Sequence, residues 1–212
     1  MDASIEIFDA YLALGNGSLF TIEHLSLGAR AYALPGPNGC GKTTLLRCLC
    51  GLQKMDRGRI VIGGIELSQY PHKAKAMLAY VPDTAQFYPH VSVENAIRFM
   101  LALKRRPVSS GDLFAAYDSF GLGAHRGTAY ASLSLGWRKK VLLHAALRTD
   151  PGVLLMDEPT VGLDQTAVSA LTTEIRNRTS RGGLTLFSSH DTGFIESTGA
   201  EIVDIFIQGV GR

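Results

Sequence analysis

The sequence predicts an α/β domain: a mostly parallel sheet flanked by helices, with an N-terminal antiparallel β subdomain and an inserted α-helical subdomain. Two observations predict this class. A short apolar strand at 29–34 runs through a glycine-rich turn into a helix, and apolar strands alternate with amphipathic helices from Trp137 onward. The pattern at about 87–148 is mainly helical and predicts the inserted subdomain. We expect 1–212 to form a single domain, because no repeat or linker interrupts it.

The first part of the chain is expected to be mainly β. Its strands are predicted at 4–8, 19–27, 29–34 and 58–64. The first two would form an antiparallel edge sheet, and the third would lead into the glycine turn. A helix is predicted at 42–50, where Gly51 would end it.

The middle of the chain is predicted to contain two helices with apolar faces directed to the core. Ser92 can cap the first, and Asp112 can cap the second. The first face consists of Val93, Ala96, Ile97, Met100 and Leu103. The second consists of Leu113, Ala116, Tyr117 and Phe120.

After the helical stretch, the α/β alternation resumes. Helices are predicted at 137–148 and 165–179, and strands at 153–156, 184–188 and 201–207.

Composition limits the classes of protein to consider. With 212 residues, of which 46% are hydrophobic, the chain can bury a sizeable core and is not disordered. A formal net charge of +2 does not indicate a nucleic-acid partner, and none is expected. No apolar run reaches the roughly 18 residues that span a bilayer, and the N-terminus lacks the pattern of a secretion signal. We therefore expect a cytoplasmic protein that reaches a membrane only through a partner.

The glycine turn has the pattern G-x-x-x-x-G-K-S/T, which binds nucleotide phosphates. Its glycines let backbone N–H groups and the following helix N-terminus approach an anion. Lys42 would add a positive charge for the β and γ phosphates, and Thr43 could ligate Mg²⁺. The alternative, a turn with a surface lysine, is disfavoured by the strand before the turn and the helix after it. The residues expected to bind nucleotide are Gly36, Pro37, Asn38, Gly39, Cys40, Gly41, Lys42, Thr43 and Thr44.

Two carboxylates follow the apolar strand at 153–156. Asp157 and Glu158 would lie at the carboxyl edge of the sheet, where doubly wound folds bind their ligands. Asp157 is expected to hold Mg²⁺ through water, and Glu158 to orient or deprotonate an attacking water. Alone, an acidic pair before Pro159 is more often a turn, but the phosphate-binding stretch upstream favours the catalytic interpretation.

Five stretches follow one another in an order and at a spacing that match a known set of motifs: Gly36–Thr44, Leu133–Trp137, Leu154–Thr160, Val161–Asp164 and Ser188–Asp191. In that order they resemble the Walker A, signature, Walker B, D-loop and switch-histidine motifs of ATP-binding cassette (ABC) transporter nucleotide-binding subunits, in particular small exporter-type cassettes. The first motif alone would leave GTPases, kinases and helicases open, whereas a signature ahead of Walker B is specific to this family. The resemblance covers essentially the whole chain and implies a P-loop NTPase core that binds ATP and Mg²⁺.

The resemblance also implies a head-to-tail dimer with a second cassette, which is a copy of this chain or a paralogue. Each ATP would lie between Lys42 of one chain and the signature of the other. There Ser134 and Gly136 open a helix, so a hydroxyl and free N–H groups can take the γ-phosphate. An ordinary helix cap at Ser134 is compatible with that role. Asp164 is the matching D-loop aspartate.

Two further roles follow from the resemblance. His190 would contact the γ-phosphate and help to position the water beside Glu158, although a lone histidine after a strand is usually a surface residue. Tyr11 lies where the family stacks an aromatic ring on adenine, and Phe8 or Phe20 could serve instead.

The sequence departs from the family pattern at two places. Asp83 stands where the Q-loop usually has glutamine, and a carboxylate can ligate Mg²⁺ directly but cannot donate an amide hydrogen bond. We therefore expect Asp83 as a further metal ligand. In the signature, Leu135 replaces a glycine and Trp137 the glutamine. Both departures are expected to change affinity or rate rather than the type of reaction.

The predicted function is ATP hydrolysis that drives substrate through a separate membrane-spanning partner, on the cytoplasmic face of a membrane. The loop at Asp83 and the neighbouring helical subdomain are the expected docking surface. One alternative is a soluble ABC ATPase acting on ribosomes, DNA or metal-cluster assembly, although no second cassette, coiled-coil insertion or basic arm is visible. Another is a cassette that binds ATP without hydrolysing it.

Overall fold

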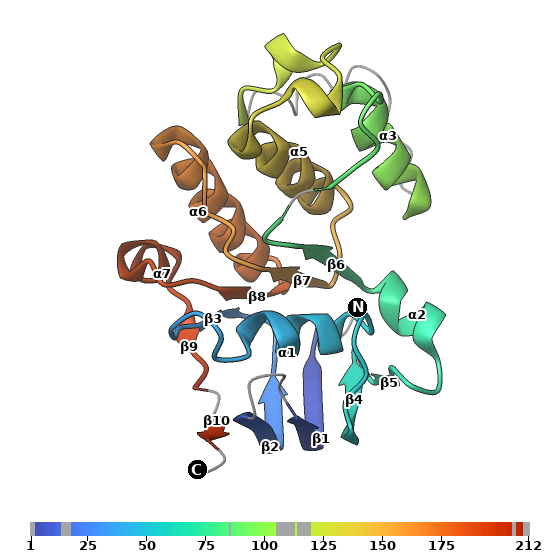
Figure 1. Cartoon of the computed structure of the whole chain (residues 1–212), viewed down its shortest axis with the longest axis vertical. Coiled ribbons are helices and arrows are strands. Elements are labelled where there is room, and N and C mark those ends of the chain that lie inside the picture. The colour runs from blue at the N-terminus through green and yellow to red at the C-terminus, as the bar shows by residue number, and fades with distance from the viewer. Residues whose placement is uncertain are drawn as a thin grey trace.

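The structure is a computed structural model that describes residues 3–13, 18–84, 86–104, 113, 120–204 and 207–209. Two sheets form its framework, and helix α1 lies between them (Figure 1). No helix among the described residues is long and apolar enough to cross a bilayer.

The parallel sheet has the strand order β6-β7-β8-β3-β9. Its strands are β3 (Ala31–Leu34), β6 (Leu78–Val81), β7 (Val153–Met156), β8 (Leu184–Ser188) and β9 (Glu201–Ile202). The antiparallel sheet has the order β10-β2-β1-β4-β5. Its strands are β1 (Ile5–Ala13), β2 (Ser18–Leu27), β4 (Arg57–Ile62), β5 (Ile65–Glu66) and β10 (Ile207–Gly209). The predicted α/β class with an N-terminal antiparallel part is confirmed.

The helices cover both faces of the parallel sheet. They are α1 (Lys42–Leu49), α2 (Pro71–Ala76), α3 (Val93–Leu103), α5 (Leu135–Arg148), α6 (Gln165–Ser180) and α7 (Thr192–Thr198), with short 3₁₀ turns at Gly123–His125 and Tyr130–Ser132. In Figure 1, α1 and the antiparallel sheet lie on one side of the parallel sheet and α6 on the other. Helices α3 and α5 pack on each other at the end of the molecule farthest from the antiparallel sheet.

Strand β7 shows why the parallel sheet is apolar on both faces. Val153 and Leu155 belong to the core shared with α1 and the antiparallel sheet. Leu154 and Met156 belong to the core shared with α3, α5 and α6. Since successive side chains of a strand point to opposite faces, an uninterrupted apolar run is what a strand buried on both sides needs.

Polar side chains start the helices where the sequence predicts caps. Ser92 Oγ accepts from Asn95 N at 3.3 Å at the start of α3, and Ser134 Oγ accepts from Trp137 N at 3.4 Å at the start of α5. Each bond satisfies one of the N–H groups that a helix N-terminus leaves without a partner. The predicted cap at Asp112 lies outside the described residues.

Two predicted strands are wrong in extent. The strand predicted at 4–8 continues as β1 to Ala13, past an irregularity where Asp9 has a φ of 48°. The strand predicted at 201–207 is two separate strands: β9 pairs with β3 in the parallel sheet, and β10 pairs with β2 in the antiparallel sheet. The mainly apolar pattern of this stretch does not reveal that the chain changes sheets.

One residue of the predicted α3 face is not in the core. Val93, Ala96 and Ile97 are buried, whereas Leu103 is 67% exposed. Leu103 is the last residue of α3 and borders a surface groove beside β6.

Helix α5 contains a buried histidine that makes the fold sensitive to acid. His144 is 2% exposed, and its ring meets Phe120 edge to face. Burial, and to a smaller degree the charge of Arg148, lower its pKa from 6.5 to about 4. Between those two values the unfolded chain binds a proton that the folded chain does not bind, so unfolding becomes easier as the pH falls through this window.

Because of His144, we expect the free energy of unfolding to fall by about 2 kcal/mol between about pH 7 and about pH 5. Urea titrations at the two pH values measure it. His144→Gln cannot titrate and should lose this part of the pH dependence, whereas His72→Gln, at an exposed position of α2, should keep it. Equal pH dependence in the His144→Gln variant and the wild type would contradict the prediction.

Candidate active site

The phosphate-binding stretch forms a backbone cradle between β3 and α1. Gly36, Gly39 and Gly41 have φ angles of 134°, 81° and 94°, a region that side chains other than glycine rarely adopt. Helix α1 begins at Lys42 without a side-chain cap, so the N–H groups of its first turn are directed at whatever occupies the cradle. The local backbone is therefore built to bind an anion.

Lys42 places a buried positive charge in this cradle. Its Nζ donates to Gly36 O at 2.5 Å and to Pro37 O at 3.1 Å, and lies 3.8 Å from Glu158 Oε1. The side chain is 7% exposed. The loop thus holds the ammonium at the position where the predicted phosphates would lie.

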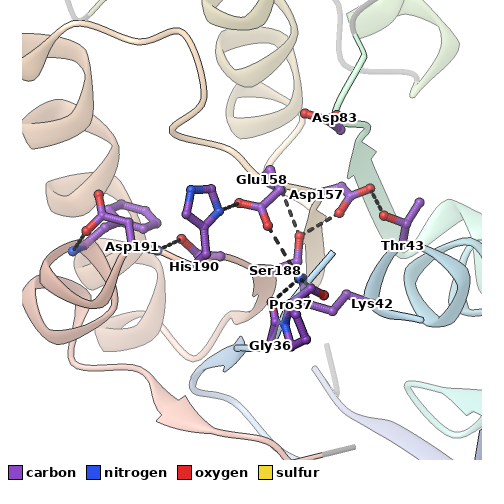
Figure 2. Close-up of polar contacts among 12 residues, drawn as sticks. Gly36, Pro37, Lys42, Thr43, Asp83, Asp157, Glu158, Ser188, His190 and Asp191 are labelled. Carbon is purple, nitrogen blue, oxygen red and sulfur yellow. Dashed lines mark hydrogen bonds and ion pairs between the residues drawn. The ribbon is translucent and has the colours of Figure 1, made fainter. Parts of the chain in front are cut away.

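Asp157 lies opposite the cradle, at the end of β7, and both of its carboxylate oxygens accept hydrogen bonds (Figure 2). Thr43 Oγ1 donates to Oδ2 at 2.7 Å, and Ser188 Oγ donates to Oδ1 at 2.6 Å. The residue is 1% exposed. Mg²⁺ prefers oxygen ligands and usually takes one or two from protein and the rest from phosphates and water. The pair of Thr43 and Asp157 therefore fits the predicted metal.

Glu158 occupies a strained backbone position beside Asp157. Its φ is 43°, which is uncommon for a residue other than glycine. Its N–H donates to Ser188 Oγ at 2.9 Å, which helps to hold this conformation. Its Oε1 is buried without a hydrogen-bond partner. A buried carboxylate oxygen that accepts no hydrogen bond, next to a cradle for phosphates, can accept a proton from a water bound there.

Ser188 has contacts in this site that the sequence did not predict. Its hydroxyl joins the carboxylate of Asp157 to the backbone of Glu158, so it fixes both acidic residues relative to β8. A buried serine at the carboxyl end of a parallel strand was the available signal.

His190 lies beside Glu158, as predicted. Its Nδ1 is 3.1 Å from Glu158 Oε2, and its side chain is 69% exposed. The next residue, Asp191, caps α7 by accepting from Phe194 N at 2.9 Å. The histidine is thus directed at the glutamate from the start of a short helix, with one face open to solvent (Figure 2).

Asp83 borders the same cavity, which has a volume of about 410 Å³ and is lined mainly by the cradle, Asp157 and Glu158. Its side chain is 53% exposed, and Oδ1 lies 3.7 Å from Lys139 Nζ. The structure therefore brings together the three predicted metal ligands, Thr43, Asp83 and Asp157, around one cavity.

The signature residues lie elsewhere on the surface. Ser134 and Gly136 do not line the cavity that the cradle borders. Gly136 instead packs against the D-loop, where an added Cβ would lie 2.2 Å from Gly162 O. Asp164, at the end of this loop, caps α6 by accepting from Ala167 N at 2.9 Å. It also accepts from Lys140 Nζ at 2.5 Å, and this bond, together with the cap bond, lowers the pKa of Asp164.

Replacing Gly136 with alanine should therefore disturb the contact between the signature and the D-loop. We expect the free energy of unfolding to fall by about 1–3 kcal/mol, because the new methyl group meets a backbone carbonyl that cannot easily move away. Gly127→Ala is the matched control, since a Cβ there meets nothing within 4 Å. Urea unfolding of the two variants checks the prediction, and equal stability would argue against this packing.

Tyr11 is not among the residues that line the cavity. It lies in β1, opposite Thr21 and Arg57. Of the two alternatives, Phe8 has the Arg59 guanidinium 4.3 Å above its ring, so that face is covered. The side chain of Phe20 lies outside the described residues. Adenine stacking on Tyr11 stays a prediction.

The chemical requirements for cleaving a nucleoside triphosphate meet in one cavity: donors for phosphates, oxygens for Mg²⁺ and a buried carboxylate for water. Together with the parallel sheet, this arrangement defines a P-loop nucleoside triphosphatase. Residues 24–161 match the family described as ABC transporter. The chain belongs to this family.

Named relatives of the chain belong to the same family. The chain is 33% identical to a "Probable ABC transporter ATP-binding protein" of Azorhizobium caulinodans, over 85% of this chain and 66% of the relative. It is 31% identical to the "SkfA peptide export ATP-binding protein SkfE" of Bacillus subtilis, over 86% of this chain and 77% of the relative. A solved structure titled "Structure of ATP binding subunit of ABC transporter" superposes with a TM-score of 0.78 at 25% identity, covering 91% of this chain and 81% of that one.

The prediction of an ATP-binding, ATP-hydrolysing subunit of an ABC transporter is confirmed at the level of the family. Among these relatives, some are named for export and others for import. The rival prediction of a soluble ABC ATPase acting on ribosomes, DNA or cluster assembly is not favoured by these names.

Proposed function

We propose that this chain hydrolyses ATP with Glu158 as general base, and that Thr43 and Asp157 would hold the Mg²⁺ that accompanies ATP. The observation that carries the proposal is the buried Oε1 of Glu158, which has no hydrogen-bond partner and forms an ion pair with the Lys42 ammonium at 3.8 Å. When bound, Mg²⁺ would neutralise charge on the β and γ phosphates. Asp83, at the rim of the same cavity, supplies a third metal ligand.

The residues around Glu158 then have separate tasks. Lys42 and the N–H groups of the cradle bind the phosphates, and residues 36–44 together enclose them. Glu158 accepts a proton from the attacking water through Oε1. His190, which contacts Oε2 at 3.1 Å, orients the carboxylate and reaches toward the γ-phosphate. Ser188 keeps the backbone of Glu158 in its strained conformation.

A second cassette completes each site in this proposal. Ser134 and Gly136 lie outside the cavity of their own chain, so they are free to meet ATP held by another chain. Asp164 in the D-loop fixes the contact between the two cassettes from its position beside α5. The second cassette is a copy of this chain or a paralogue, and Tyr11 stacks on the adenine.

The membrane-spanning partner docks on the loop at Asp83 and on the inserted helical subdomain, at about 87–148 of the single domain 1–212. This places the cassette at the cytoplasmic face of the membrane. Two relatives support the partnership by name: the peptide export protein of Bacillus subtilis and the "Cytochrome c biogenesis ATP-binding export protein CcmA" of Ruegeria pomeroyi, which is 33% identical over 88% of its length.

Co-purification tests the partnership. The chain is tagged in the cells that make it and extracted from membranes in mild detergent, and the untagged strain serves as the control. We expect a polytopic membrane protein in stoichiometric amount. Recovery of ribosomes, nucleic acid or assembly factors instead would overturn the transport role but leave the ATPase chemistry intact.

A further inference from the structure

Lys139 of α5 binds the two loops that carry Asp83 and Asp157, two of the three proposed metal ligands. It is 2% exposed. Its Nζ donates to Pro82 O at 3.0 Å, to Asp83 O at 2.8 Å and to Asp157 O at 3.2 Å. An ammonium has three protons to donate, so these carbonyls account for all of them.

Through these three carbonyls, Lys139 connects separate parts of the fold. Pro82 and Asp83 directly follow β6, and Asp157 directly follows β7. Lys139 belongs to neither strand but to α5, the helix that Ser134 caps. One side chain therefore fixes the distance between the ends of two strands, and fixes both ends to the signature helix.

A buried ammonium is costly, so its presence needs an explanation. Burial lowers the pKa of Lys139, and the nearby carboxylates of Asp83, Asp157 and Glu158 raise it. Asp83 Oδ1 lies 3.7 Å away, at ion-pair distance, and its side chain is 53% exposed, so another ligand can still reach this carboxylate. An apolar side chain of similar length would fill the space but would remove this donor from all three carbonyls, of which that of Asp157 belongs to a buried residue.

We propose that Lys139 is a positioning residue that sets the spacing of Asp83 and Asp157 for Mg²⁺ and links that spacing to α5. The inference rests on the proposed function, since it concerns the same metal. In the described part of the chain, the hydrogen bonds of Lys139 go to the carbonyls after β6 and β7 and not to the cradle, so we expect the binding of phosphates in the absence of Mg²⁺ not to depend on it.

The test is the ATP affinity of the purified chain with Mg²⁺ and with EDTA, measured by titration calorimetry. In the wild type, Mg²⁺ should tighten ATP binding. In Lys139→Met, that gain should shrink by about tenfold, the size expected from losing hydrogen bonds of a charged group, while affinity in EDTA stays within about twofold. A merely structural role would lower both affinities together.

Lys104→Met is the matched control. Lys104 Nζ likewise donates to two backbone carbonyls, Lys75 O at 2.8 Å and Leu78 O at 2.7 Å, but these lie at the opposite end of β6 from Asp83. This variant should keep the full gain from Mg²⁺. If Lys139→Met cannot be purified folded, Lys139→Gln, which has no charge and fewer donors, should show a partial loss of the gain.

The outcomes separate this inference from the proposed function. If Mg²⁺ does not tighten ATP binding in the wild type, the proposed metal site itself is wrong. If it does so in the wild type and equally in the Lys139 variants, the proposed function stands and the role of Lys139 is overturned. An equal loss in Lys104→Met would also overturn it, because a lysine bound to carbonyls at the other end of β6 would then have the same effect.

Discussion

Replacing Glu158 with glutamine should lower the rate of ATP hydrolysis by about 10²–10⁴-fold, the usual contribution of a general base. The amide keeps the shape of the side chain but cannot take the proton of the attacking water. ATP binding should remain, because the cradle and Lys42 are unchanged. Since hydrolysis would no longer separate the two cassettes, the variant should also accumulate as an ATP-bound dimer.

Phosphate release and light scattering measure these two effects. Glu196→Gln is the control, because Glu196 is an exposed carboxylate on α7 and should leave both rate and dimer unaffected. A Glu158→Gln variant that hydrolyses ATP at the wild-type rate would mean that another group activates the water. A wild type with no turnover, and a variant that forms no dimer, would instead fit a cassette that binds ATP without hydrolysing it.

Replacing Lys42 with methionine should weaken ATP binding by about 10²–10³-fold. A unit charge about 4 Å from a phosphate contributes about 4 kcal/mol at the effective dielectric constant of a protein surface, and the lost contacts with water offset part of this. The carbonyls of Gly36 and Pro37 would also lose the cation that they now bind. The cradle would then repel phosphate oxygens instead of attracting them.

Titration with a fluorescent ATP analogue measures the affinity, with Lys73→Met as the control. Lys73 is an exposed lysine of α2, so its replacement should leave affinity unchanged. Circular dichroism shows whether each variant is folded. A folded Lys42→Met variant that binds ATP as the wild type does would contradict the position assigned to the phosphates.

Local patterns were sufficient to predict much of the fold. Ser92 and Ser134 cap their helices where predicted, because a cap depends only on neighbours in sequence. Strand β7 was predicted with its observed bounds, since four apolar residues between a turn and two carboxylates leave little freedom. The extension of β1 past Asp9 was not predicted. It depends on Gly58, whose added Cβ would lie 2.6 Å from Asp9 O, and such a close approach between distant segments leaves no local pattern.

Some residues of the site could also be predicted from local patterns, and others could not. Lys42, Asp157 and Glu158 could be predicted because each belongs to a motif with a fixed spacing. Ser188 and Lys139 could not be assigned roles, because each acts on residues far away in the sequence. Their contacts follow from the way that β8 and α5 pack beside β7, and that packing is a property of the whole fold.

The most direct test is the rate of phosphate release from ATP by the chain assembled with the proposed membrane partner and second cassette. We expect phosphate release that requires Mg²⁺ and is lost in the Glu158→Gln variant. The absence of Mg²⁺-dependent release from the wild-type assembly would contradict this expectation.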